Sequence, residues 1–307
     1  MSVIEVNNLT KDYGFGRGVF DVSFKINKGE VFGFLGPNGA GKSTTIRHLM
    51  GFSKPQSGST KIFDLETFDN YSKILNNVGY IPGEIALPQG LTGYEFINMM
   101  QNMYGKKNDE MLNKMLDLFK LEPNVLKMET KRMSLGVKRK LAIVTAFMSD
   151  PDVLILDEPT SGLDPVMQEV FINFIKEEKN RGKTILLSSH IFSEVDATCD
   201  RICIIKDGKI VSEFIANDLK HATLKHFKIE FNSTSDLNKF KDNIPNYINI
   251  VKEKDNILLV SCLDDNINEF INYISDYEVK EFTNIKETLQ DYFMKFYKEN
   301  KDFGGAL

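Results

Sequence analysis

Short segments of alternating or continuous apolar residues dominate the first part of the chain. They predict strands over residues 2–9, 19–26, 30–35 and 78–81. The third of these segments runs directly into a stretch of glycines, and apolar residues at helical spacing then predict a helix over residues 42–50. Gly51 is the expected end of that helix. The chain therefore opens with mixed strands and helices.

The pattern changes to helices from about Leu91 to Ser149. Apolar residues recur every three or four positions over residues 93–104 and 109–119, as they do on the buried side of a helix. This part of the chain is expected to form a helical subdomain, spanning about residues 91–149, within a larger α/β domain.

Strand–helix alternation then resumes. Residues 152–157 and 183–189 form short continuous apolar segments, joined by a predicted helix over residues 166–180. Apolar strands of this kind are buried on both faces in a parallel sheet. Residues 201–214 predict a hairpin that turns at Asp207 and Gly208.

A second domain is expected after about residue 216. From there the order is strand, helix, strand, strand, helix, strand, which is the order of a small α+β ferredoxin-like unit. A last predicted helix over residues 286–300 carries an apolar stripe, for which packing on this small domain is weighed against contact with another protein. The sequence thus predicts domains over residues 1–216 and 217–307.

Composition narrows the class of protein. A chain of 307 residues fits about two domains. The net charge of −5 gives no basic footprint, so no nucleic-acid partner is expected. No apolar run approaches the roughly 20 residues of a membrane span. Cys199, Cys203 and Cys262 lack a CxxC pattern and are expected to be buried thiols in the reducing cytoplasm.

The clearest motif is GPNGAGKST, which spans Gly36 to Thr44 and fits G-x-x-x-x-G-K-[ST]. A strand precedes it and a helix follows it, which is the context that a phosphate-binding loop requires. Glycines allow successive backbone N–H groups to surround phosphate oxygens, and the helix N-terminus adds a positive dipole. Lys42 is expected to reach the β- and γ-phosphates, and the Ser43 hydroxyl to bind Mg²⁺. The expected nucleotide-binding residues of the loop are Gly36, Pro37, Asn38, Gly39, Ala40, Gly41, Lys42, Ser43 and Thr44.

Three further residues predict cleavage chemistry. Asp157 ends a buried strand and suits the Mg²⁺ shell, and Glu158 is then placed to orient or deprotonate an attacking water. His190 ends the next strand, at the edge where ligands of open α/β sheets bind. Together with Lys42, Glu158 and His190 form the predicted catalytic group, with ATP and Mg²⁺ as the ligands.

From residue 3 to about 215, the chain resembles the ATP-binding subunit of an ABC transporter. The phosphate loop is similar to Walker A, Val153–Glu158 is similar to Walker B, and Ser161–Asp164 is similar to the D-loop. The resemblance implies that His190 is the switch histidine, that Asp164 contributes to the nucleotide site, and that Tyr13 stacks on adenine.

The segment Met133–Lys140, MSLGVKRK, lies where this family has its signature sequence. The resemblance implies a head-to-tail homodimer or a paired subunit, in which Ser134 and Gly136 of one copy bind the γ-phosphate held by the other. Three positions depart from the pattern. Leu135 replaces the first signature glycine, Lys138 replaces the signature glutamine, and Gly83 replaces the usual Q-loop glutamine. Glu84, next to Gly83, is left as a possible substitute for that glutamine.

The combined prediction is a P-loop ABC-type ATPase domain with a helical insert, followed by a ferredoxin-like domain. The "SLG" and "PGE" segments are similar to exporters of the bacitracin-resistance and multidrug type, which implies a subunit held on the inner face of the cell membrane by a separate permease. Export of a drug, peptide or lipid-like cargo is the leading hypothesis. The alternative is a soluble ABC-type ATPase in translation, repair or regulation. The basic residues Lys131, Arg132, Lys138, Arg139 and Lys140 are predicted to form a solvated helix face.

Overall fold

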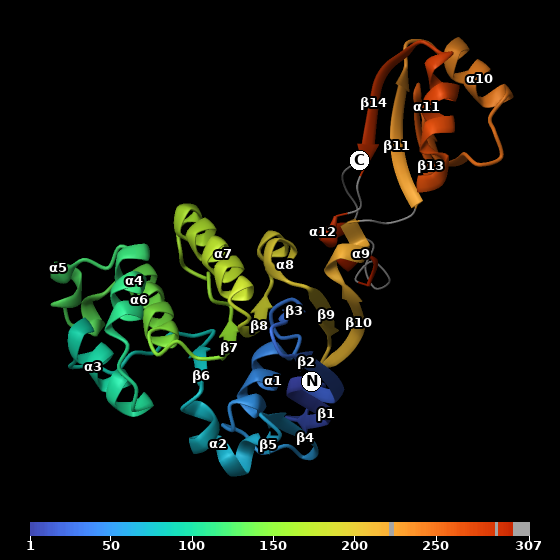
Figure 1. Cartoon of the computed structure of the whole chain (residues 1–307). Coiled ribbons are helices and arrows are strands. Elements are labelled where there is room, and N and C mark those ends of the chain that lie inside the picture. Colours follow the sequence, from blue (N-terminus) through green and yellow to red (C-terminus); the bar gives the residue numbers. More distant parts are fainter. Residues whose placement is uncertain (221–223, 286–287, 297–307) are drawn as a thin grey trace. The chain divides into compact units, whose positions relative to one another are not determined.

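The structure is a computed structural model that describes residues 1–220, 224–285 and 288–296 (Figure 1). The chain forms two compact units that divide after Ala216. No helix within these described ranges is long and apolar enough to cross a bilayer.

A six-stranded sheet organises the first unit, in the order β10-β9-β3-β8-β7-β6. Its five strands from β9 to β6 are parallel, and β10 closes the edge as the second arm of a hairpin with β9. The strands are β3 (Val31–Leu35), β6 (Val78–Ile81), β7 (Val153–Asp157), β8 (Thr184–Ser189), β9 (Arg201–Lys206) and β10 (Lys209–Ile215). Every residue of β3, β7 and β8 is buried, as the continuous apolar pattern predicts.

A second, antiparallel sheet has the order β2-β1-β4-β5. Its strands are β1 (Ser2–Asp12), β2 (Gly18–Asn27), β4 (Ser57–Ile62) and β5 (Leu65–Glu66). Residues of both sheets and of α1 (Lys42–Leu49) share one core. The rings of Phe24 and Phe32 stack across it, with centroids 5.1 Å apart. This packing holds α1 and the loop before it in a fixed position.

The remaining helices of the first unit lie mostly in the segment that the sequence marks as helical. Figure 1 shows α3 to α6 grouped together, in green. Thr92 and Glu95 form a capping box at the start of α3, which fixes its first residue. The helices are α2 (Thr67–Leu75), α3 (Gly93–Tyr104), α4 (Asp109–Leu118), α5 (Pro123–Leu126), η1 (Thr130–Arg132), α6 (Leu135–Phe147), α7 (Pro165–Asn180) and α8 (Phe192–Thr198). The short helix α9 (Ala216–Lys220) begins at the last residue of the first unit and continues into the second.

The second unit has the ferredoxin-like order. Its sheet runs β12-β13-β11-β14, all antiparallel, and α10 and α11 contribute Phe240 and Phe270 to its core. The elements are β11 (Leu224–Phe231), α10 (Thr234–Asp242), β12 (Asn249–Lys254), β13 (Ile257–Leu263), η2 (Asp264–Asn266), α11 (Ile267–Ser275), β14 (Val279–Ile285) and α12 (Leu289–Lys295). The predicted last helix lies partly outside the described residues.

Candidate functional site

The phosphate loop joins β3 to α1 at the carboxyl end of the parallel strands. Gly39 and Gly41 have φ angles of 83° and 111°, a left-handed conformation that favours glycine. A side chain at Gly36 would place its Cβ 2.6 Å from the carbonyl oxygen of Ile205. A Cβ at Gly39 would meet nothing within 4 Å. The loop is therefore packed tightly on one side and open on the other.

The open side faces a cleft of about 610 Å³, hereafter the nucleotide cleft. Its lining combines loop residues with the ends of neighbouring strands. From the predicted set it takes Asn38, Gly39, Gly41, Lys42, Ser43, Thr44, Asp157, Glu158 and His190. The lining also includes Arg47, Tyr80, Pro82, Gly83, Glu84, Ala86 and Ser161. Of these, the sequence analysis singles out Gly83, Glu84 and, as the start of the D-loop segment, Ser161.

The ammonium group of Lys42 lies on the floor of this cleft. Its Nζ donates to the carbonyl oxygens of Gly36 and Pro37, at 2.6 and 3.1 Å, and lies 3.1 Å from Oε1 of Glu158. Lys42 is only 5% exposed. Gly36 and Pro37 thus contribute backbone carbonyl oxygens, which accept from Lys42 and hold its ammonium group near the carboxyl ends of the strands.

Glu158 links the two catalytic strands. It follows β7 with a left-handed φ of 51°, and its backbone N–H donates to the carbonyl of Ser188 on β8 at 2.9 Å. Its second carboxylate oxygen, Oε2, contacts Nδ1 of His190. A carboxylate held by an imidazole in this way can hold a water and accept its proton.

Asp157 is held separately. The hydroxyl of Ser188 donates to Asp157 Oδ1 at 2.8 Å, which leaves Oδ2 as a free acceptor beside the backbone of Gly83. Among the described residues, no three His, Cys, Asp or Glu side chains gather as a metal site. The oxygens of Ser43 and Asp157 nevertheless fit Mg²⁺, because this ion keeps waters and substrate phosphate oxygens as its remaining ligands.

Seven predicted residues lie outside the lining of the nucleotide cleft: Gly36, Pro37 and Ala40 of the phosphate loop, and Tyr13, Ser134, Gly136 and Asp164 elsewhere. Tyr13 is 48% exposed in the turn between β1 and β2. Ser134 caps α6, where its hydroxyl accepts from the N–H of Val137 at 3.3 Å, and Asp164 caps α7 by accepting from Met167 at 3.0 Å. Gly136 packs so closely on the next loop that a Cβ would lie 3.1 Å from the oxygen of Gly162. Within one copy, the residues of the signature segment therefore do not line the cleft.

The prediction of a solvated basic face is wrong for Arg139. This residue is 2% exposed, and its guanidinium donates to three backbone carbonyls: Nη1 to Pro82, Nη2 to Gly83 and Nε to Ser161. Lys131 and Arg132 are exposed as predicted, and Lys138 and Lys140 are partly buried. Arg139 points inward because the first two turns of α6 pack against loops that lie far from it in the sequence.

Glu194 is a second buried charged residue that the sequence does not reveal. Its Oε2 accepts from Ser189 at 2.6 Å and from Thr160 at 3.3 Å, and its Oε1 has no hydrogen-bond partner among the described residues. Burial, together with the nearby charge of Glu158, raises the pKa of Glu194 to about 7 against the lowering effect of the hydrogen bonds from Ser189 and Thr160. The carboxyl thus joins the segment after Glu158 to the residue before His190.

Comparisons with known proteins agree with this geometry. Residues 19–161 match the family described as ABC transporter. The bacitracin transport ATP-binding protein BcrA of Bacillus licheniformis is 36% identical over 242 residues, which are 78% of this chain and 77% of that protein. An uncharacterised ABC transporter ATP-binding protein of Bacillus subtilis, YdbJ, is 30% identical over 99% of this chain and 98% of its own length.

A solved structure shows the same fold. It is a dimeric ATP-binding cassette in a post-hydrolysis state with bound ADP and phosphate, and it superposes with a TM-score of 0.63 at 25% identity, covering 69% of this chain and 98% of that one. Fold, phosphate loop and sequence similarity agree, and this chain belongs to the ABC transporter family as one of its ATP-hydrolysing, ATP-binding subunits.

Proposed function

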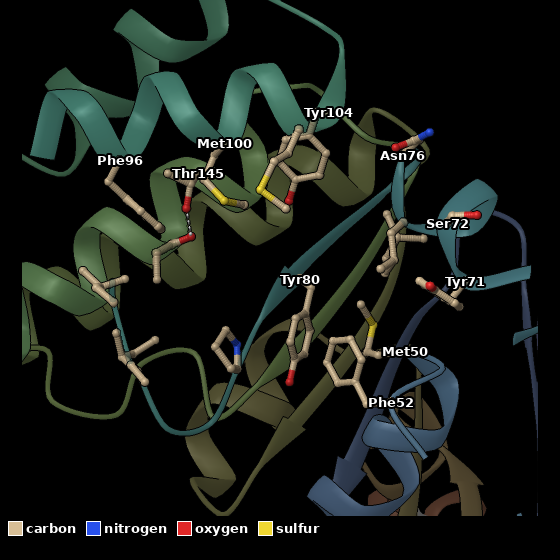
Figure 2. A pocket seen from close by; sticks show the side chains of 18 residues that line it. Met50, Phe52, Tyr71, Ser72, Asn76, Tyr80, Phe96, Met100, Tyr104 and Thr145 are labelled. Carbon is tan, nitrogen blue, oxygen red and sulfur yellow. Dashed lines mark hydrogen bonds between the residues drawn. The ribbon is translucent and has the colours of Figure 1, made fainter. Parts of the chain in front are cut away.

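We propose that this ATPase powers a separate membrane permease that exports a drug, peptide or lipid-like cargo. The observation that carries the proposal is a second cleft, hereafter the apolar cleft, with a volume of about 420 Å³ (Figure 2). It lies between α2 and β6 on one side and α3 and α6 on the other. Its wall includes Phe52, Tyr71 and Met103, which are 57%, 54% and 67% exposed.

The occupant of the apolar cleft is an amphipathic helix of the permease. Exposed contiguous apolar side chains of this kind mark interaction sites, and an apolar groove takes the apolar side of a helix. The apolar cleft also shares Tyr80, Pro82 and Ala86 with the nucleotide cleft. An occupant of one cleft therefore touches the wall of the other, which supports coupling of transport to ATP. Such docking would hold the subunit on the inner face of the membrane.

The residues of the nucleotide cleft support the following roles in ATP binding and hydrolysis. Lys42 and the backbone N–H groups of the loop bind the β- and γ-phosphates, and Ser43 and Asp157 hold Mg²⁺, which neutralises charge on the transferred phosphate. The arriving γ-phosphate competes with Glu158 for Lys42. Once released from Lys42, Glu158 accepts a proton from water while His190 keeps the carboxylate in place.

A second copy completes each site in this proposal. The N-terminus of α6, with Ser134 and Gly136, is suited to a phosphate because its free N–H groups and dipole favour an anion. These residues do not line the cleft of their own copy, and the related cassette of known structure is dimeric. Ser134 of the partner subunit would therefore approach the γ-phosphate. Tyr13 stacks on adenine, and Asp164 supports the segment that faces the partner.

Binding to membranes tests the permease proposal. Met103→Glu places a charge in the apolar cleft at an exposed position, so the fold should tolerate it. Wild-type protein should bind washed membranes of the source organism in a saturable manner, and Met103→Glu should bind about tenfold less tightly, as expected when a charge enters an apolar contact.

The matched control is Met128→Glu, since Met128 is also an exposed methionine of the helical segment, at 41%, but lies outside the apolar cleft. Its binding should equal that of the wild type. Protein-free liposomes should retain neither protein. Equal binding to liposomes and to membranes would refute attachment through a permease and favour the alternative of an ATPase without a transport partner.

A further inference from the structure

The buried Arg139 ties the signature helix to two loops of the nucleotide cleft. Its side chain contacts Pro82 and Gly83, which follow β6, at 2.9 and 2.7 Å, and Ser161, which follows β7, at 2.9 Å. All three of these residues line the nucleotide cleft, and Pro82 also lines the apolar cleft. One side chain on α6 thus contacts two segments of the nucleotide cleft, and the segment that follows β6 also borders the apolar cleft.

The chemistry of these contacts is unusual for a buried cation. No carboxylate lies within ion-pair distance of Arg139 in the described part of the chain; its hydrogen bonds go to carbonyl oxygens, and the charges of Asp157 and Glu158 favour the cation from farther away. Removing the side chain would leave three partly buried carbonyls without this donor, which is costly, whereas moving all three segments together preserves every bond. The geometry therefore favours motion of α6 and the two loops as one body.

The contact between Gly136 and Gly162 adds a second constraint. A Cβ at Gly136 would lie 3.1 Å from the Gly162 oxygen, and a Cβ at Gly162 would lie 3.1 Å from the Leu135 side chain. The first turn of α6 therefore packs directly on the loop that Arg139 also binds through Ser161. The position of Ser134 at the start of that turn follows the position of these loops.

We infer that Arg139 is a positioning residue for the signature segment. It holds Ser134 and Gly136 in the position in which they meet the nucleotide of the partner copy. Because it also binds the loop that borders the apolar cleft, the signature segment moves together with that loop. This inference rests on the proposed dimer, in which signature residues act across the interface. Arg139 itself touches no nucleotide, so its loss should leave ATP binding by one copy intact.

Pairs of variants separate the possible roles. Lys42→Ala removes the positive charge that binds the phosphates. Ser134→Arg places a bulky side chain in the signature segment and blocks its contact with the γ-phosphate. Neither should dimerise alone with MgATP, but their mixture forms one site from intact halves and should dimerise. This reference pair tests the proposed shared site by itself. Failure of the reference pair would overturn the shared site, and with it the inference.

Arg139→Gln is the test variant. Introduced together with Glu158→Gln, it should weaken MgATP-dependent dimerisation at least about tenfold, the effect expected when a charged hydrogen bond is lost. The affinity of the monomer for a fluorescent ATP analogue should change less than about twofold. Arg139→Lys, which keeps the charge but not the fork of donors, should fall between Arg139→Gln and the wild type. Lys127→Gln, which removes one positive charge at an exposed position of the helical subdomain outside the signature segment, should dimerise like the wild type.

Mixing assigns the side of the site on which Arg139 acts. Arg139→Gln should form dimers with Lys42→Ala and none with Ser134→Arg, because it shares the signature defect of Ser134→Arg. The reverse result would overturn the inference, because Arg139 would then serve the phosphate loop of its own copy. Rescue by neither partner would overturn it as well, since that outcome indicates general disruption of the domain.

Discussion

Nζ of Lys42 lies 3.1 Å from Oε1 of Glu158, so the cation of the phosphate loop and the expected catalytic base form an ion pair. Both side chains are largely withdrawn from water, at 5% and 16% exposed. The carboxylate occupies the direction from which a phosphate would approach Lys42. Binding of ATP therefore exchanges one anion for another, and the exchange frees Glu158 for its proposed role.

Glu158→Gln tests this relationship. The amide cannot accept a proton as a general base, so ATP hydrolysis should fall by about 10²- to 10⁴-fold, and a stable ATP-bound dimer should accumulate. ATP affinity should rise, because Lys42 no longer has a carboxylate partner. Phosphate release and binding of a fluorescent ATP analogue measure the two effects. Glu110→Gln, an exposed change on α4, is the control. Near-normal turnover in Glu158→Gln would remove Glu158 from catalysis.

Gly136→Ala should disturb the signature turn through packing alone. The added methyl would lie 3.1 Å from the backbone oxygen of Gly162, which cannot rotate away as a side chain can. We expect a loss of about 1–3 kcal/mol in the free energy of unfolding, typical of overpacking, together with weaker MgATP-dependent dimerisation. Urea unfolding and size-exclusion chromatography measure these. Lys127→Ala, at an exposed position outside the signature segment, should change neither, and an unchanged dimer in Gly136→Ala would show that this contact is dispensable.

Glu194 predicts a pH dependence of stability. Its pKa is about 7 in the folded protein against 4.5 for the free side chain, so the folded state binds a proton that the unfolded state releases between these values. The free energy of unfolding should therefore decrease as pH rises from about 4.5 to 7, by up to about 3 kcal/mol from this group.

Glu194→Gln keeps an acceptor for Ser189 without titrating. Urea unfolding at several pH values should show a smaller decrease for Glu194→Gln than for the wild type, and the variant should be the more stable protein at pH 8. If both proteins lose stability with the same slope, Glu194 is not protonated in the folded state.

A chain that ends at Asn217 should still bind ATP. The core around Ile4, Phe34 and Ile46 contains only residues of the first unit, and the core around Phe227 and Phe240 contains only residues of the second. Each unit can therefore fold around its own apolar residues. Binding of a fluorescent ATP analogue, with circular dichroism as the check on folding, measures the outcome. A folded but non-binding truncation would place the second domain in the nucleotide site.

Local patterns in the sequence predict most of the nucleotide cleft. The phosphate loop, the acidic pair after β7 and His190 after β8 each depend on a short segment, and parallel strands bring their carboxyl ends to one edge. The ferredoxin-like order of the second unit could be predicted for the same reason. The strands and helix within residues 57–75 could not be predicted, because β4 buries only Thr60 and Ile62 and lacks the apolar run of the other strands.

Arg139 shows where such prediction ends. Its hydrogen-bond partners lie 22, 56 and 57 residues away in the sequence, and it stands in a run of basic residues of which the others are exposed or partly buried. Glu194 is similar, because Thr160 lies 34 residues away. No local pattern separates these side chains from solvated ones, because their burial depends on how distant loops pack.

The ring of Tyr80 belongs to the walls of both clefts. It packs edge-on against Phe52 on the side of the apolar cleft, with ring centroids 5.8 Å apart, and burial together with the charge of Asp157 raises the pKa of its hydroxyl to about 12 (Figure 2). Because the two clefts share this wall, binding in one can change the affinity of the other, and the effect is reciprocal. If an occupant of the apolar cleft changes the affinity for ATP by some factor, ATP changes the affinity for that occupant by the same factor. If the proposed permease helix fills the apolar cleft, the affinity of this subunit for the permease would change with the nucleotide that it holds, and a small molecule bound beside Tyr80 would change both affinities at once.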